Sequence, residues 1–138
     1  MKIDLRPATE EDLNWLEQLY ESQMRPYVEL THSWDDKKFT QTYDPEKVQV
    51  IQVDGDDAGM IKVVDQGDHL YLADLQISPH YQRKGIGRRL IGEVKGHAKR
   101  NQKCLKLRVL KGNPAKRLYL REGFVELEEH DYSYVLGI

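Results

Sequence analysis

A basic loop with two glycines is the part of the sequence whose residue types and spacing most directly suggest chemistry. The stretch QRKGIGRRL runs from Gln82 to Leu90 and holds Gly85 and Gly87, with arginines and lysines around them, just before an apolar helical pattern. Glycine lets backbone N–H groups turn inward without a Cβ in the way, and a helix N-terminus adds roughly half a positive charge. Such a loop is suited to binding a phosphate or a pyrophosphate.

Two well-known phosphate motifs do not fit this loop. A Walker loop needs Lys-Ser or Lys-Thr after its last glycine, but Gly87 is followed by two arginines. The dinucleotide fingerprint needs a third glycine at position 90, which is Leu90, and it belongs on the first strand of a βαβ unit. Taken alone, the loop is equally consistent with a helix start that has a solvated basic first turn.

A second group of candidate residues follows the next predicted strand. In VLKGNPAKRLYLREGF, Asn113 comes just after the strand end and Tyr119 lies about one and a half turns into the next helix. This strand and the strand before the glycine loop are joined by a helical crossover, so they should run parallel. A ligand could enter where they separate, with its phosphates on the loop and its reactive end near Asn113 and Tyr119.

The pattern of the whole chain predicts the elements that must position these residues. Alternating apolar residues predict strands, and 3.6-residue periodicity predicts helices. The resulting order is β-α-α-β-β-β-α-β-α-β-β, which indicates an α+β or mixed α/β fold. A length of 138 residues without repeats or linkers predicts a single domain over 1–138. The segment from Arg25 to Tyr43 is irregular, and a loop with a short helix is expected there.

Composition narrows the classes of function. A net charge of −2 does not favour nucleic acid or an anionic membrane as partner, and no apolar run approaches the length of a membrane span. The first residues do not resemble a signal peptide, so a cytoplasmic protein is expected. The one cysteine, Cys104, opens an apolar alternation and is predicted to be a buried structural thiol. No metal site is predicted.

Two motifs of the sequence resemble those of a known superfamily. LADLQISPHYQRKGIGRRLIGEV resembles the central motif of the GNAT N-acetyltransferases, with its pyrophosphate loop at Gln82 to Gly87, and NPAKRLYLREGF resembles the motif that follows. The order of strands and helices matches along essentially the whole chain. The resemblance implies a central mixed, mostly antiparallel sheet with splayed parallel strands 4 and 5, and acetyl-CoA as cosubstrate. MRPYVELTHSWDDKKF resembles a bacterial branch whose substrates are unassigned.

The resemblance also implies roles for individual residues. Backbone amides of the loop would hold the pyrophosphate, the edge of the preceding strand would pair with pantetheine, and Asn113 would bond pantetheine as well. Tyr119 would donate a proton to the departing thiolate; core packing for Tyr119 and helix capping for Asn113 are the structural alternatives. The coenzyme-binding set is Leu75, Gln76, Ile77, Gln82, Arg83, Lys84, Gly85, Ile86, Gly87, Arg88 and Asn113.

The acceptor and the general base stay open at this stage. In the family, the segment corresponding to 25–43 covers the acceptor, so Tyr27, Glu29 and Trp34 are the candidate contacts. The glutamate base of the histone-modifying branch aligns with Tyr71, and no other acid is assigned in its place; Asp74, Glu29, His32 and Asp35 are candidates. Phe39 could wall the pocket or seal the helices onto the sheet.

The sequence therefore predicts an N-acetyltransferase that moves an acetyl group from acetyl-CoA to a primary amine by direct attack in a ternary complex. The acceptor would be a small molecule, a protein N-terminus or a lysine, with no nucleic acid or membrane as partner. The alternative is a non-catalytic acyl-CoA-binding sensor. Gly92 and Gly96 lie four apart inside a predicted helix, which indicates close approach by another element or by a second copy in a homodimer.

Overall fold

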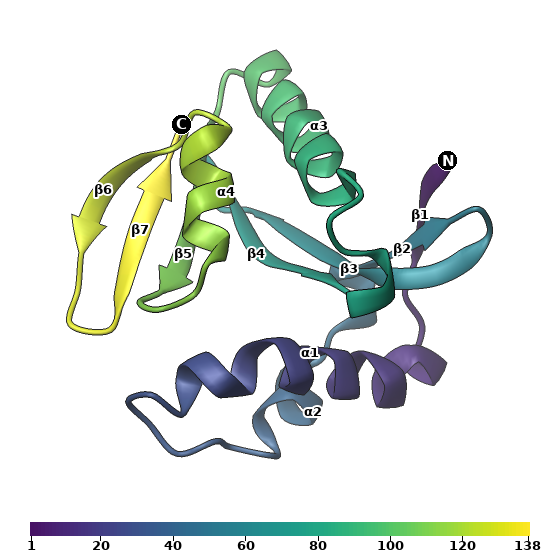
Figure 1. Ribbon diagram of the computed structural model, residues 1–138. Helices are drawn as coiled ribbons and strands as arrows, with labels where there is room; N and C mark the ends of the chain where they lie inside the picture. The colour runs from purple at the N-terminus through teal and green to yellow at the C-terminus, as the bar shows by residue number, and fades with distance from the viewer. The chain divides into compact units, whose positions relative to one another are not determined.

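The computed structural model describes residues 1–138 as a seven-stranded mixed sheet with four α-helices (Figure 1). The strand order in the sheet is β1-β2-β3-β4-β5-β7-β6. The strands are β1 (Ile3–Pro7), β2 (Gln49–Val53), β3 (Asp56–Asp65), β4 (His69–Ile77), β5 (Cys104–Leu110), β6 (Val125–Glu129) and β7 (Ser133–Gly137). The helices are α1 (Leu13–Val28), α2 (Lys38–Thr42), α3 (Ile86–Arg100) and α4 (Ala115–Arg121). The predicted order of elements and the mixed α/β class are confirmed.

The chain forms two compact units. The first consists of Met1–Lys62 and Asp74–Lys84, and the second of Val63–Ala73 and Gly85–Ile138. The divisions fall inside β3, inside β4 and within the glycine loop, so each of these segments contributes residues to both units.

The first unit is built on the antiparallel strands β1, β2 and β3. The β2–β3 turn has positive φ at Asp54 and Gly55, as expected for a tight hairpin turn in DGDD. Helices α1 and α2 pack together beside these strands. A small core cluster joins them, with Trp15, Phe39 and Tyr43 partly buried against Ala8, Leu16, Val48, Val50 and Met60.

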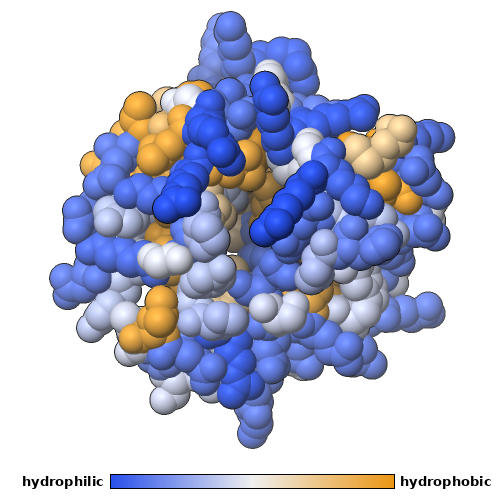
Figure 2. Space-filling view, viewed as in Figure 1, coloured by the Kyte–Doolittle hydropathy of each residue, from blue (hydrophilic) through white to orange (hydrophobic).

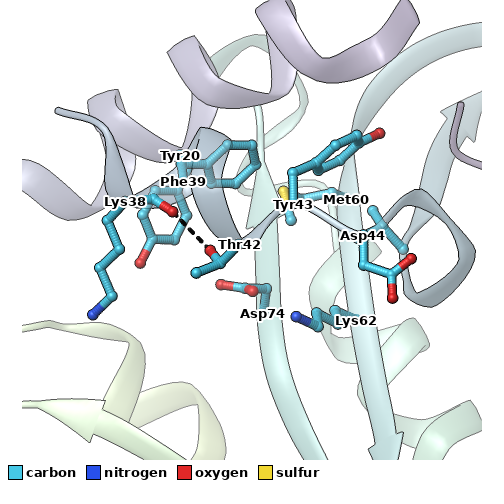
Figure 3. A pocket seen from close by; sticks show the side chains of 10 residues that line it. Tyr20, Lys38, Phe39, Thr42, Tyr43, Asp44, Met60, Lys62 and Asp74 are labelled. Atoms are coloured by element: carbon cyan, nitrogen blue, oxygen red, sulfur yellow. Dashed lines mark hydrogen bonds between the residues drawn. The ribbon is translucent and has the colours of Figure 1, made fainter. Parts of the chain in front are cut away.

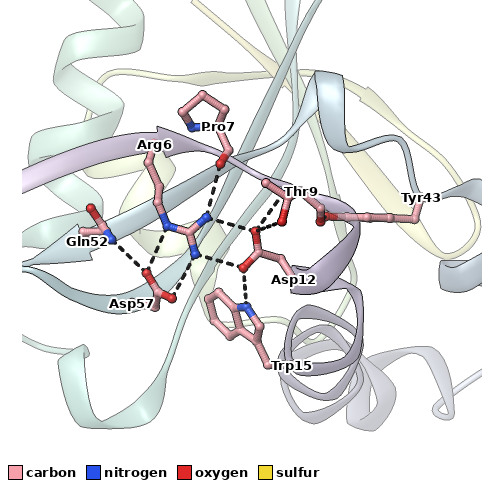
Figure 4. Close-up of polar contacts among 8 residues, drawn as sticks. All are labelled: Arg6, Pro7, Thr9, Asp12, Trp15, Tyr43, Gln52 and Asp57. Atoms are coloured by element: carbon pink, nitrogen blue, oxygen red, sulfur yellow. Dashed lines mark hydrogen bonds and ion pairs between the residues drawn. The ribbon is translucent and has the colours of Figure 1, made fainter.

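A polar network around Arg6 fixes the start of α1 to β1 and β3 (Figure 4). The two terminal nitrogens of Arg6 each donate to Asp12 at 2.9 Å, and the same guanidinium contacts Asp57 at 2.9 and 3.3 Å. Asp12 also accepts from the Trp15 indole at 2.9 Å and from the Thr9 backbone N–H at 2.8 Å. Every oxygen of this shielded carboxylate therefore has donors, which is the condition for burying a charge at low cost.

The second unit contains the parallel pair that the crossover predicts. Strands β4 and β5 pair in parallel from His69↔Cys104 to Leu72↔Leu107, and β4 continues beyond this pairing to Ile77. Strands β5, β7 and β6 then pair antiparallel. Helix α3 buries one stripe, made by Ile86, Leu90, Ile91 and Ala98.

Three local expectations are corrected by the structure. Helix α1 continues through Pro26 to Val28, because a proline in the last turn removes a single helical hydrogen bond. Cys104 is exposed and not buried, since Leu105, Leu107 and Val109 take the inward positions of β5. No other element of the chain approaches Gly92 or Gly96, since a Cβ would meet open space at Gly92 and only the Arg100 side chain of the same helix at Gly96; approach by a second copy stays a prediction.

Most side chains on the face shown in Figure 2 are hydrophilic, with separate hydrophobic groups among them. None of the helices is long and apolar enough to span a membrane.

Candidate functional site

The glycine loop ends in an open helix N-terminus. Gly85 is the N-cap of α3 and adopts a left-handed conformation with φ 81° and ψ 8°, and Arg83 is also left-handed with φ 61°. The backbone N–H of Arg89 bonds to the Gly85 carbonyl, and no side chain caps the three N–H groups before it. Alternating handedness at a helix start turns successive N–H groups toward one point, which forms an anion-binding concavity.

The side chain of Gln82 holds this loop in place. Its amide nitrogen donates to the Ile77 carbonyl at 2.8 Å and to the Gln23 side chain at 3.0 Å. The loop is thereby tied to the end of β4 and to α1. The ammonium of Lys84 lies 5.8 Å from the ring centroid of Tyr81, which keeps it near the loop.

Strand β4 approaches β3 closely just before the loop. A Cβ added at Gly59 would overlap the carbonyl oxygen of Gln76, so this position of β3 accepts only glycine. The Gln76 side chain is buried at 8% exposure, whereas Leu75 and Ile77 are half-buried. These three residues are the predicted pantetheine edge.

Asn113 and Tyr119 lie in the second unit and have structural contacts of their own. The Asn113 side-chain oxygen accepts from the Ala115 N–H at 2.9 Å, which caps α4 and leaves its amide nitrogen for another partner. Tyr119 is 9% exposed and packs edge-on against Phe124, with ring centroids 5.7 Å apart. The structural alternatives that the sequence raised, helix capping by Asn113 and core packing by Tyr119, are thus both present. The capping bond uses only the oxygen of the Asn113 side chain.

The candidate acceptor contacts Tyr27, Glu29 and Trp34 do not form a single cluster. Tyr27 is half-buried in α1, and Glu29 forms an exposed ion pair with Arg25 at 3.0 Å. The Trp34 ring lies 5.9 Å from the ring of Tyr20, and its indole N–H is buried without a hydrogen-bond acceptor.

A cavity of about 70 Å³ lies in the first unit, where residues of α1, α2, β3 and β4 line it (Figure 3). Among the residues that the sequence suggested, only Phe39 and Asp74 line it. The full lining is Tyr20, Lys38, Phe39, Thr42, Tyr43, Asp44, Val48, Met60, Lys62 and Asp74. One sequence signal could have indicated Asp74: it continues the alternation of Leu70 and Leu72, each 4% exposed, along one face of β4.

The cavity perturbs two of its titratable groups. Burial raises the pKa of the Asp74 carboxyl to about 6, even though Lys62 and the side-chain amide of Gln76 both favour the charged form. Burial and the nearby charge of Asp74 raise the pKa of Tyr20 to about 12. A half-buried carboxylate that forms no ion pair, next to a protonated phenol, is the kind of arrangement that occurs at ligand and catalytic sites.

Comparison with solved structures gives matches along the whole chain. PaiA N-acetyltransferase from Thermoplasma acidophilum, in complex with coenzyme A, matches with a TM-score of 0.79 at 19% identity, over 99% of this chain and 98% of that one. The ribosomal-protein-S18-alanine N-acetyltransferase of Escherichia coli matches with a TM-score of 0.72 at 20% identity, over 99% and 93%. N-acetylglutamate synthase from Neisseria gonorrhoeae, complexed with coenzyme A and N-acetyl-glutamate, matches with a TM-score of 0.69 at 17% identity, over 99% and 35%. At these identities the likeness shows a shared fold.

Sequence comparison identifies the family. A search of curated proteins found no significant match. A family model for the acetyltransferase (GNAT) domain matches residues 44–126, which is more than half of the chain and includes β4, the glycine loop and α4. The loop geometry fits an anionic coenzyme, because its uncapped N–H groups stand beside the exposed basic residues Arg83, Lys84 and Arg88. The chain therefore belongs to the GNAT family of acetyltransferases, which use acetyl-CoA as cosubstrate.

Proposed function

We propose that this protein transfers the acetyl group of acetyl-CoA to a primary amine, and that the amine attacks directly in a ternary complex. The observation that supports this proposal most is the open N-terminus of α3, where Arg83 and Gly85 are both left-handed and no side chain occupies the N–H groups. Acetyl-CoA supplies an activated acetyl thioester, and the chain supplies binding, orientation and proton transfer.

In this proposal the loop from Gln82 to Arg88 binds the pyrophosphate through its backbone. The side chains of Arg83, Lys84 and Arg88 are exposed and add positive charge at the rim. The edge formed by Leu75, Gln76 and Ile77 pairs with the pantetheine amides as a neighbouring strand would. The free amide nitrogen of Asn113 donates to the same arm, while its oxygen keeps α4 capped.

Tyr119 is the proposed general acid. It would donate its phenolic proton to the sulfur that leaves when the acetyl group is transferred. Such help is worth about 10²–10⁴-fold in rate. The Tyr119 ring is only 9% exposed and packs against Phe124, so it is held in one orientation. A fixed orientation suits a positioned proton donor as well as a core residue.

Direct attack requires no acyl-enzyme. The one cysteine, Cys104, is exposed at the first residue of β5, whereas Asn113 and Tyr119 come after the end of that strand. Tyr27, Glu29 and Trp34 are proposed to contact the acceptor outside the cavity described above; Trp34 is linked to that cavity through its contact with Tyr20.

The coenzyme proposal is tested with a glycine pair in α3. Gly87 lies in the first turn of α3, while Gly92 lies in its exposed middle with open space around it. Gly87→Val is expected to abolish coenzyme A binding in calorimetry, because a branched side chain blocks approach of the phosphates to the backbone. Gly92→Val makes the same residue change within α3 and is the matched control, so the affinity of this variant for coenzyme A should stay unchanged.

Equal affinity of the folded Gly87→Val protein and the wild type would contradict the phosphate role of the loop. Coenzyme A binding without release of free thiol for any primary amine would support the acyl-CoA sensor instead.

A further inference from the structure

We infer that the cavity of the first unit selects an acceptor amine that also carries an anionic group, such as a carboxylate, with Asp74 binding the amine and Lys62 and Lys38 attracting the anion. This inference rests on the proposed function and concerns the substrate class of the same reaction.

The place of the cavity relative to β4 supports an acceptor site. Asp74 lines the cavity and directly precedes Leu75, Gln76 and Ile77, the proposed pantetheine edge, on the same strand. A volume of about 70 Å³ is small for a ligand site, so we expect the cavity to receive only the aminomethyl end of a ligand. Met60, Val48 and the aromatic rings supply apolar walls for the carbon next to the nitrogen.

The charges that line the cavity are not paired with each other. Asp44 is occupied, since it accepts the Glu46 N–H at 3.1 Å and has the Lys47 ammonium at 4.0 Å. Asp74, Lys62 and Lys38 form no ion pair in the structure, although all three line the cavity. Figure 3 shows the Asp74 carboxylate between the Lys62 ammonium on one side and the Lys38 ammonium on the other.

This balance determines which acceptors are favoured. One unpaired carboxylate suits one ammonium or amine, and two unpaired lysines leave an excess of positive charge around it. A second cation on the ligand, as in a polyamine, would be repelled, whereas a carboxylate would be attracted. The Tyr20 hydroxyl stays protonated across the physiological range, because its pKa is raised to about 12, and it can donate to the same anion.

The chemistry at Asp74 follows from its position. As the amine nitrogen forms a bond to the thioester carbonyl carbon, the carbon–sulfur bond breaks and its electron pair stays on sulfur. The nitrogen loses one proton, which Asp74 accepts, and the sulfur gains one proton from the general acid. The acceptor must present an unprotonated amine to react, and its nitrogen gains positive charge as it attacks. A nearby carboxylate stabilises that developing charge and then accepts the proton.

The test uses three four-carbon amines whose far ends are anionic, uncharged and cationic: γ-aminobutyrate, butylamine and putrescine. Thiol release from acetyl-CoA is measured for each at saturating coenzyme. We expect kcat/KM to fall in that order, with γ-aminobutyrate about 10-fold or more above putrescine, since a close charge pair in a shielded site is worth at least that ratio. An equal or reversed order overturns the inference.

Variants at two lysines, Lys62 in the cavity and Lys37 outside it, test whether the preference arises at this site. Lys62→Met is expected to reduce the ratio of γ-aminobutyrate to putrescine by about 10-fold, and Lys62→Glu to reverse the preference. Lys37→Met removes the same charge from an exposed neighbour of Lys38 that does not line the cavity, so the ratio should not change. A ratio that responds equally to Lys37 and Lys62 would show general surface attraction and contradict the site.

Failure of this inference is distinguishable from failure of the proposed function. If coenzyme A binds in calorimetry and other amines release thiol, but none of the three probes does, then the acceptor class is wrong and acetyl transfer stands. If coenzyme A does not bind at all, the proposed function itself fails.

Discussion

Two shielded aspartates in the first unit have opposite surroundings. Asp12 is 6% exposed and receives two hydrogen bonds from Arg6, one from Trp15 and one from the Thr9 backbone. The hydrogen bonds of Arg6 hold its pKa well below the usual range. Asp74 has no ion pair, and burial raises its pKa to about 6.

The difference separates a structural carboxylate from one that is available to a ligand. The desolvation cost of Asp12 is offset inside the protein, so its charge serves to join β1, β3 and α1 (Figure 4). The desolvation cost of Asp74 is offset only in part, by Lys62 and the side-chain amide of Gln76, and an amine in the adjacent cavity would supply a further contact (Figure 3).

The largest expected effect comes from Asp74→Asn. We expect kcat/KM for primary amines to fall by about 10²–10⁴-fold, because the variant keeps the shape of the side chain and loses the proton acceptor. Coenzyme A affinity in calorimetry and the melting temperature should be at or above the wild-type values. In the wild type the rate should decline as pH falls through about 6, where Asp74 becomes protonated, and this acid limb should be absent from the residual activity of the variant. An unchanged rate in Asp74→Asn would remove Asp74 from the reaction.

Arg6→Ala is the matching change for Asp12, because it removes the cation that pairs with this carboxylate. It leaves the Asp12 charge shielded with only its Thr9 and Trp15 donors, so we expect the free energy of unfolding to fall by about 3 kcal/mol. Denaturant unfolding measures this loss, and turnover below the melting transition should stay close to the wild-type value. A stable Arg6→Ala protein with a strongly reduced rate would instead place this network in the active site.

Tyr119, in the second unit, raises the same question of structural or functional role, because it is both a core residue and the proposed general acid. Tyr119→Phe retains the ring and its contact with Phe124, and we expect turnover to fall by about 10–10³-fold with a smaller loss of stability than in Tyr119→Ala. Tyr119→Ala should lose stability as well, because the ring itself is removed. If the Phe variant keeps full activity and only the Ala variant is impaired, Tyr119 is a packing residue.

The smallest expected effect is on stability as a function of pH, where the two aspartates differ in sign. Asp12 has a lowered folded pKa, so its contribution is complete above its ordinary pKa near ~4 and is lost as pH falls below that value. Asp74 has a raised folded pKa, so its contribution is complete below pH ~4 and is lost as pH rises through about 6.

Unfolding at several pH values tests this difference. The stability of Asp74→Asn relative to the wild type should rise by about 1–2 kcal/mol between pH ~4 and ~7, after allowance for solvent screening. Asp12→Asn should show its full penalty above pH ~4 and a decreasing one as pH falls below that value. If the stabilities of the two variants relative to the wild type changed in parallel with pH, the opposite pKa shifts of Asp12 and Asp74 would be contradicted.

The sequence predicted those parts of the fold that depend on local pattern. The order of strands and helices followed from apolar periodicity, and the glycine loop at Gly85 and Gly87 followed from residue type. The cavity could not be predicted in the same way, because Tyr20, Phe39, Lys62 and Asp74 come from α1, α2, β3 and β4 and meet only after folding. Which of the β4 side chains faces the cavity depends on the strand register, which is set by tertiary pairing.

Two other errors have the same origin. Cys104 was predicted to be buried from its apolar neighbours, but the register of β5 gives the inward positions to Leu105 and Leu107. The segment from Arg25 was expected to be irregular, yet α1 continues to Val28 and tolerates Pro26 in its last turn. In both cases an average tendency of the residue type was overruled by packing of the whole element.

The most direct test of acetyl transfer is a paired measurement of free thiol and N-acetylated amine in one reaction. The protein would be incubated with acetyl-CoA and a mixture of primary amines and short peptides, with Gly87→Val in parallel. We predict that the wild type produces thiol and N-acetyl product in equal amounts, as identified by mass spectrometry, and that Gly87→Val produces neither. Thiol release without any acetylated amine, or equal product from the two proteins, would contradict an acetyltransferase that binds its coenzyme through the glycine loop.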